Sequence, residues 1–258
     1  MAARKIQVGH LDVRVTAEPL TPAAFAPFGD VVCNPRPDVL PSATASSRRA
    51  ASAPLPANAV SANQGFAIQY RRVSRVANLY ASSPAPSRHP GEPVTSLFVC
   101  AARPLHSSRT RQTAEFVVRH LERHPFTAQT FSPLASSASL YLVIVAPSLP
   151  PAVGDGTEEM AVAAPPGATP GRGLPNLKEL RAFVGTRAQA VTYGAGTWHA
   201  PMVVLGAPGT TLDFVVSQFA SGVADEDCQL LEFEAEGRPE PQLRVQIPVS
   251  NLPTMEKL

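Results

Sequence analysis

Twenty-eight prolines among 258 residues limit how this chain can fold. Proline fixes φ, lacks a backbone N–H and interrupts both helices and central strands. The prolines gather, together with Ala, Ser or Gly, in stretches at about 35–58, 82–93 and 146–175. These stretches predict surface insertions rather than linkers between domains. We therefore expect one domain over residues 1–258 that is built from short elements.

The segments between the proline clusters have the composition of β-strands. They are short, rich in β-branched and aromatic residues, and bounded by Gly or Pro, which favours a sandwich or barrel over helical folds. The run 140–145 is apolar at every position, which indicates a strand buried on both faces. A helix should begin at Thr21-Pro22 and end at Gly29. The expected strands include 66–70, 94–101, 140–145, 188–193, 212–217 and 230–234.

Bulk properties exclude several classes of protein. A hydrophobic content of 44% is enough for a core, and a net charge of +2 does not favour a nucleic-acid partner. The apolar run 140–147 is too short to span a bilayer, and the first residues lack the apolar stretch of a signal peptide. Three widely separated cysteines form neither a disulfide framework nor a zinc motif. We expect a cytoplasmic protein that acts on a small molecule, with no membrane or nucleic-acid partner.

One predicted strand ends in residues that can carry chemistry. If the segment 114–124 is a continuous strand, Phe116, Val118, His120, Glu122 and His124 lie on the same face. That face begins apolar and ends in a carboxylate flanked by imidazoles. We expect it to begin in the core and end in a pocket, and to form a hairpin with 127–131.

A second stretch, 193–202, ends a strand, turns through Gly194 and Gly196, and then places His199 at the start of the next strand. It resembles the second cupin motif, Pro-x-Gly-x-x-His, with Gly194 at the proline position. The first cupin motif, His-x-His followed by Glu, is matched in spacing by Glu122, His124 and Gln129. The resemblance implies an all-β, cupin-like double-stranded β-helix, a β-barrel with a few short helices and long Pro-rich loops.

Two kinds of chemistry suit this set of residues. Glu122, His124 and His199, with Gln129 as a weaker ligand, can hold a divalent metal ion. Without metal, Glu122, His124 and His199 can still exchange protons, because histidine titrates near neutral pH and a nearby carboxylate orients it. No other cofactor is expected. Trp198 is a candidate packing wall that can also contact the ligand.

Several motifs together resemble the ureidoglycolate lyase family, formerly called the ureidoglycolate hydrolases, and the insertions are similar to those of a fungal member. The motifs are the stretch 20–31, Asn63-Gln64-Gly65, Glu122-Arg123-His124-Pro125, 129–131, 180–183 and 196–201. The resemblance implies a homodimeric carbon–nitrogen lyase of allantoin degradation, a branch of purine catabolism. Such an enzyme cleaves (S)-ureidoglycolate to glyoxylate and urea.

The resemblance also implies roles for single residues. His124 and His199 would share the proton transfers, and Glu122 would orient them or bind metal. The substrate would be bound by Gln129, Asn63, Gln64, Arg71 and Trp198. Arg72 and Arg123 are further candidates for the substrate carboxylate, although Arg123 should face the other side of its strand. Two alternatives stay open: another cupin enzyme, such as a metal-dependent isomerase or oxygenase, and a cupin that binds small carboxylates without turnover.

Overall fold

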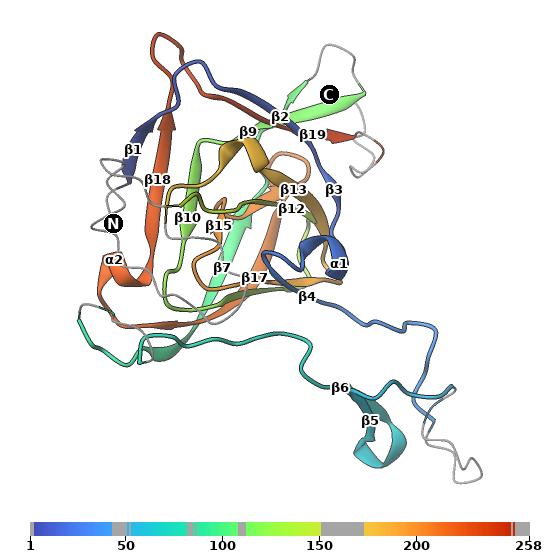
Figure 1. The fold of residues 1–258 in the computed structure, drawn as a ribbon. Coiled ribbons are helices and arrows are strands. Elements are labelled where there is room, and N and C mark those ends of the chain that lie inside the picture. Colours follow the sequence, from blue (N-terminus) through green and yellow to red (C-terminus); the bar gives the residue numbers. More distant parts are fainter. Residues whose placement is uncertain are drawn as a thin grey trace.

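The computed structural model describes residues 3–42, 51, 53–81, 85, 87–107, 112–150, 173–248 and 250. Most of these residues form β-strands, and the helices are short (Figure 1). The prediction of an all-β fold is confirmed, with strand pairings that make open sheets rather than one closed ring within these ranges. The middle of the insertion 146–175 lies outside the described residues. None of the described helices is long and apolar enough to cross a membrane.

The largest sheet has eight strands and carries the strand that the sequence predicts to be buried on both faces. Its strands, in spatial order, are β1 (Arg4–Gln7), β18 (Gln229–Glu234), β10 (His120–Arg123), β15 (Trp198–His199), β12 (Leu140–Ala146), β13 (Arg181–Thr186) and β3 (Glu18–Pro19), with β16 (Val203–Leu205) also paired to β12. Most neighbours in it are distant in sequence, so the sheet joins both ends of the chain.

Three smaller sheets complete the architecture. The five-stranded sheet contains, in order, β4 (Gly29–Val32), β14 (Ala190–Tyr193), β11 (Gln129–Pro133), β17 (Thr211–Ala220) and β7 (Glu92–Ala101). The four-stranded sheet contains β2 (Asp12–Thr16), β19 (Gln242–Pro248), β9 (Thr113–Val117) and β8 (His106–Ser107). The last is a hairpin of β5 (Ala59–Ala62) and β6 (Ala67–Tyr70), joined by the 3-10 turn η1 (Asn63–Gly65).

The eight-stranded sheet lies between the four-stranded and five-stranded sheets and packs against both. On one face of β12, Leu142 and Ile144 pack in a cluster with β19 residues such as Val245. On the other face, Val143 and Val145 pack in a second cluster that includes residues of the five-stranded sheet. The prediction that this strand is buried on both faces is confirmed. It forms the wall shared by the two halves of the core.

Short helices begin where the sequence predicts but end earlier. Helix α1 (Pro22–Phe25) has Thr21 as its N-cap, whose hydroxyl accepts a hydrogen bond from the Ala24 N–H at 3.2 Å. The predicted end at Gly29 is wrong, since the helix stops at Phe25 and Gly29 opens β4. Gly29 is needed for another reason: a Cβ there would collide with the carbonyl oxygen of Thr192 on β14. The other helices are η2 (Leu177–Glu179) and α2 (Ala224–Asp227).

The prediction of one continuous strand over 114–124 is wrong. Strand β9 ends at Val117 and pairs with β19, whereas β10 begins at His120 and pairs with β18 and β15. Because the chain passes from one sheet to another at 118–119, the alternation of faces restarts there. Phe116 and Val118 therefore pack in the cluster on the far side of the sheet from Glu122. The predicted hairpin with 127–131 is also absent, since β11 pairs with β14 and β17.

Candidate active site

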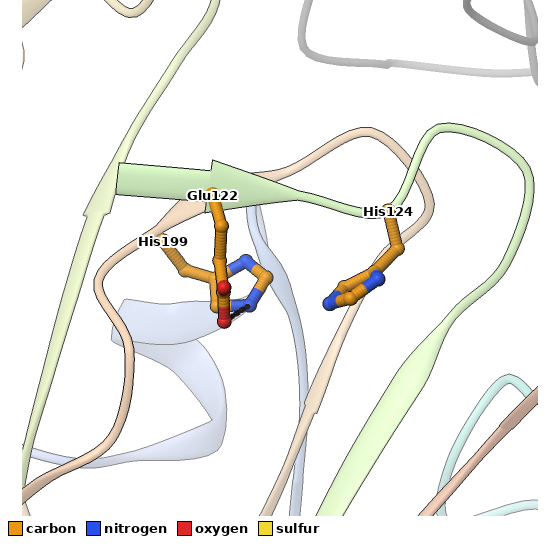
Figure 2. A group of neighbouring side chains, drawn as sticks. All are labelled: Glu122, His124 and His199. Atoms are coloured by element: carbon orange, nitrogen blue, oxygen red, sulfur yellow. Dashed lines mark ion pairs between the residues drawn. The ribbon is translucent and has the colours of Figure 1, made fainter. Parts of the chain in front are cut away.

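Neighbouring strands of the eight-stranded sheet bring the candidate residues together. Glu122 on β10 lies directly opposite His199 on β15 in an antiparallel register. Side chains in such a pair project from the same face with their Cβ atoms about 5 Å apart. His124 leaves the end of β10 two residues later, and Figure 2 shows its ring turned toward the other two side chains. The group faces the five-stranded sheet, where Tyr193 covers the His199 ring.

The three side chains are close enough to act on one atom. A ligand atom from each of Glu122, His124 and His199 lies within 4.8 Å of the other two. The Oε1 atom of Glu122 is 3.6 Å from Nε2 of His199, the pair marked in Figure 2. The two imidazole rings are 5.5 Å apart between centroids. The structure thus joins residues that are far apart in the sequence.

Backbone carbonyls fix the orientation of both imidazoles. Nδ1 of His124 lies 2.6 Å from the carbonyl oxygen of Asp227, and Nδ1 of His199 lies 2.9 Å from that of Thr197. A carbonyl only accepts, so each Nδ1 carries the proton and donates it. Each Nε2 is then a lone-pair acceptor, and both are buried without a hydrogen-bond partner in the described part of the chain. This tautomer is the one that directs a lone pair into the site.

Burial also sets the charge of the site. Burial, followed by the nearby His124, lowers the pKa of His199 to about 3, against the opposing effect of the bond to Thr197. Burial likewise lowers the pKa of His124, opposed by its bond to Asp227. The Tyr193 ring stacks on the His199 ring, with 3.9 Å between the ring centroids, and shields that face of the imidazole from water. Both histidines are therefore neutral at physiological pH.

Glu122 differs from the histidines because its pKa lies close to neutral pH. Burial raises its pKa to about 7, and a weak bond from the thiol of Cys228 lowers it. The Cys228 sulfur is 3.8 Å from Oε2 of Glu122, and burial followed by this carboxylate raises the pKa of the thiol to about 12. The thiol therefore stays protonated and donates. Glu122 is the group in the site best suited to gaining and losing a proton at neutral pH.

Gln129 adds a further acceptor to the site. Its side-chain nitrogen donates to Oε1 of Gln218 at 2.7 Å, which orients the amide. The oxygen of Gln129 is then buried and forms no hydrogen bond among the described residues. Sequence reasoning missed Gln218, which lies on β17 where it can be found only through its pairing with neighbouring strands. It also missed the stacking role of Tyr193, although Tyr193 directly precedes the glycine turn.

The glycine turn connects the two halves of the site. Gly196 has φ of +77°, a left-handed conformation that glycine adopts without strain. Its N–H donates to the carbonyl of His124 at 2.8 Å, so the loop that delivers His199 is tied to the loop that carries His124. The cupin-like Gly-x-x-His spacing therefore has a structural cause: the turn must both reverse the chain and touch the first motif.

A carboxylate beneath His124 holds helix α2 in place. Oδ1 of Asp227 accepts hydrogen bonds from the Tyr80 hydroxyl at 2.7 Å and the Ser221 N–H at 2.6 Å. Its second oxygen accepts from the Gly222 N–H at 2.8 Å. The main-chain oxygen of Asp227 is the one that accepts from His124. The sequence gives no sign of this support because it depends on the backbone path of α2.

The remaining predicted residues lie elsewhere. Trp198 points into the opposite core cluster, where its indole N–H donates to the carbonyl of Gly173 at 3.1 Å and Arg123 stacks on it at 4.4 Å. Arg123 therefore faces away from Glu122, as the strand alternation predicts. Asn63, Gln64 and Arg71 belong to the β5–β6 hairpin, which stands apart from the sheets in Figure 1. Within one chain the structure does not bring these residues to Glu122, His124 and His199, which together form the triad of the candidate site.

The donor set fits a divalent metal ion. Two neutral imidazoles with unpartnered Nε2 atoms, one carboxylate and one amide oxygen are ligands that such ions accept. Each imidazole also donates its other nitrogen to a carbonyl, the arrangement typical of metal-binding histidines. Acceptors alone are costly to bury unless a cation or a donating ligand meets them.

Comparison with known proteins identifies the family. A family model described as ureidoglycolate lyase matches residues 12–239. The chain belongs to the ureidoglycolate lyase family. It is 34% identical over 224 residues to the ureidoglycolate lyase of Schizosaccharomyces pombe, a match that covers 86% of this chain and 93% of that protein.

Further members of the ureidoglycolate lyase family support the same assignment. The Saccharomyces cerevisiae protein of that name is 33% identical over 216 residues, covering 81% of this chain and 87% of its own. The Burkholderia mallei protein is 28% identical over 202 residues, covering 78% and 80%. The predicted family, the likeness to fungal members and the assignment to the lyases are confirmed.

Proposed function

We propose that this protein cleaves (S)-ureidoglycolate to glyoxylate and urea. The observation that carries the proposal is the convergence of the buried Nε2 atoms of His124 and His199 on the Glu122 carboxylate. Ureidoglycolate has one carbon that bears a hydroxyl, a carboxylate, a hydrogen and a urea nitrogen. The site offers acceptors for the hydroxyl and urea donors, and one carboxyl group able to exchange a proton. Family membership supports the same substrate.

The reaction requires one proton to leave oxygen and one to reach nitrogen. As the O–H bond breaks, its electron pair forms the carbonyl, the C–N bond breaks, and the leaving urea nitrogen takes a proton. We assign both transfers to Glu122: the carboxylate accepts the hydroxyl proton and then returns it to the nitrogen. A pKa near 7 suits this exchange, whereas the lowered pKa of His199 makes that imidazole a weak base. No redox step or covalent intermediate is needed.

The histidines are assigned to ligand binding. His124, His199 and one oxygen of Glu122, with Gln129 beside them, would hold a divalent ion, leaving the other carboxylate oxygen for the proton. Such an ion would act as a Lewis acid that lowers the pKa of the substrate hydroxyl. His124 and His199 position the carbinol carbon beside Glu122, and Tyr193 excludes water from the His199 side. The three unpaired cysteines support a reducing, cytoplasmic location for the reaction.

The decisive experiment measures urea and glyoxylate released from (S)-ureidoglycolate by the purified chain. Elemental analysis before and after chelation, with activity measured at both points, tests metal binding. We expect equal amounts of the two products and loss of activity with loss of metal. Glu122→Gln should bind substrate but turn it over at least ~100-fold more slowly, the size of a general acid–base contribution. Absence of product from the intact, metal-loaded chain would exclude this substrate.

A further inference from the structure

Gln129 and Gln218 form a cross-strand pair on the five-stranded sheet. Thr130 of β11 is the register partner of Ser217 on β17. One step further along this antiparallel ladder Gln129 lies opposite Gln218, so the two side chains project from the same face. On the other side of β11, Tyr193 of β14 is the register partner of Gln129 and stacks on a histidine of the triad. Gln129 is thus held between two neighbours in a row of side chains that faces the triad.

The Gln129 amide is a direct neighbour of His124. Burial lowers the pKa of His124, whereas Asp227 and then the Gln129 side chain raise it. The atoms that these two residues leave for a ligand, Oε1 of Gln129 and Nε2 of His124, are both buried without a hydrogen-bond partner in the described ranges. Both are acceptors, and buried acceptors need a cation or a donor to meet them. The orientation of the Gln129 amide therefore affects what the triad can bind.

The two amides can form their mutual hydrogen bond in either direction. In the structure the nitrogen of Gln129 donates to the oxygen of Gln218 at 2.7 Å, which leaves the Gln129 oxygen for a ligand. If both amides turned over, the Gln218 nitrogen would donate to the Gln129 oxygen. The Gln129 nitrogen would then be free to donate to Nε2 of His124. The first arrangement presents lone pairs to a ligand, whereas the second uses them within the chain.

The chemistry of residue 218 selects between the two arrangements. A side chain that only accepts holds the Gln129 nitrogen and keeps the Gln129 oxygen toward the triad. A side chain that only donates holds the Gln129 oxygen and turns the nitrogen toward the triad. Glutamine at 218 offers both kinds of group, so the pair can follow the ligand.

We propose that Gln218 is a positioning residue that controls metal binding through Gln129. With Gln218 accepting, the Gln129 oxygen joins the three residues of the triad as a fourth ligand for a divalent ion. With Gln218 donating, the Gln129 nitrogen takes the lone pair of His124 and opposes a cation. Gln218 acts through Gln129 and is not itself a ligand. The inference rests on the metal binding put forward with the proposed function, but not on the substrate.

The Zn²⁺ affinity of Gln218 variants, measured by competition with a chromogenic chelator and without substrate, tests this role. Gln218→Glu offers only acceptors and should bind Zn²⁺ at least as tightly as the wild type. Gln218→Lys offers only donors and should bind it about 10–100-fold more weakly, the usual cost of losing a contact that orients a ligand. Affinity for Gln218→Lys equal to that of the wild type overturns the proposal.

Gln218→Leu keeps the test open if Gln218→Lys does not fold. Leucine removes the acceptor that holds the Gln129 nitrogen, so Zn²⁺ binding should again weaken by about 10-fold. Gln129→Leu removes the fourth ligand itself and should weaken binding by at least as much. Wild-type affinity in either variant contradicts the proposed role.

The charges introduced at 218 need a control of their own. In a Gln129→Leu chain there is no amide to turn, so Gln218→Glu and Gln218→Lys should differ only by the direct effect of charge on the ion. The difference between these two variants should be at least ~10-fold larger when Gln129 is present. Ser217→Glu and Ser217→Lys place the same charges at an exposed neighbouring position and should leave the affinity unchanged. Equal differences with and without Gln129 overturn the proposal, because charge alone would explain them.

The zinc and urea measurements separate this inference from the proposed function. If the Gln218 variants bind Zn²⁺ in the expected order but the wild-type chain releases no urea, the substrate is wrong and the role of Gln218 stands. If the wild-type chain releases urea and all Gln218 variants bind Zn²⁺ as it does, the substrate stands and the role of Gln218 is wrong.

Discussion

Replacing Asp227 by asparagine tests whether helix α2 supports the active site. The carboxylate accepts from the Tyr80 hydroxyl, from the N–H and hydroxyl of Ser221 at 2.6 and 2.9 Å, and from the Gly222 N–H. Burial, and then the bond to Asp227, raises the pKa of Tyr80, so this donor stays protonated. An asparagine oxygen can still accept the first three bonds, but without the charge. Its NH2 group then meets the Gly222 N–H, donor against donor.

The expected cost follows from these contacts. A hydrogen bond to a charged group contributes about 1 kcal/mol more than a neutral one, so the three weakened bonds cost about 3 kcal/mol. Loss of the Gly222 bond adds about 1 kcal/mol, which lowers the unfolding free energy by about 4 kcal/mol in all. For a chain of this size that corresponds to a Tm lower by about 8–16 °C. Because the Asp227 carbonyl also holds Nδ1 of His124, loosening α2 should lower kcat by about 10-fold, an effect of misplacement rather than lost chemistry.

Thermal and urea unfolding, together with the urea-release assay, measure both effects. Asp225→Asn is the control, since Asp225 lies on the same helix, is exposed, and loses the same charge. It should change the unfolding free energy by less than about 0.5 kcal/mol, as surface substitutions usually do. If Asp227→Asn matches this control in stability and in kcat, the carboxylate does not hold α2 and the argument is refuted.

Three further predictions concern the triad. His124→Ala and His199→Ala should each lower kcat at least ~100-fold and reduce the metal found by elemental analysis; near-normal values for either would remove that residue from the site. In the presence of chelator, Glu122→Gln should become more stable relative to wild type as pH rises. The pKa of Glu122 is about 7 in the folded state against an ordinary 4.5, so the folded state holds an extra proton between these values. The wild type therefore loses stability as pH rises across that window. A pH-independent difference in unfolding free energy between the wild type and Glu122→Gln would contradict this. The hydrogen bond from the Cys228 thiol lowers the pKa of Glu122, and a serine at this position keeps a donor. Cys228→Ala should therefore move the acidic limb of the kcat/KM profile to higher pH than Cys228→Ser does. Identical profiles for the two variants would show that the thiol does not act on Glu122.

The fold class and the triad could be predicted because local patterns determine them. Frequent prolines disfavour long helices, and the short apolar run of β12, rich in β-branched residues, favours a strand buried on both sides. The pairing of Glu122 with His199 was accessible through motif spacing, since the glycine turn must return the chain beside the strand end. The spacing could not predict the tautomers of His124 and His199, because they depend on the backbone carbonyl that accepts from each Nδ1.

The errors have a common cause in contacts between distant parts of the sequence. The pattern over 114–124 alternates as one strand does, yet it forms two strands in different sheets, because β9 pairs with β19 and β10 pairs with β18. Tertiary pairing outweighs local strand preference at that point. Gln218 was missed for the same reason: only its place on β17, within reach of Gln129, gives it a role. Trp198 adjoins His199 in sequence, but strand alternation sends it to the opposite core cluster.

The groups that the triad presents determine which ligands it can bind. With each Nδ1–H held by a carbonyl, His124 and His199 offer only lone pairs, as does the oxygen of Gln129. Ureidoglycolate supplies O–H and N–H donors that such a surface can bind, whereas its carboxylate needs a positive charge. A divalent ion held by Glu122, His124 and His199 would supply that charge.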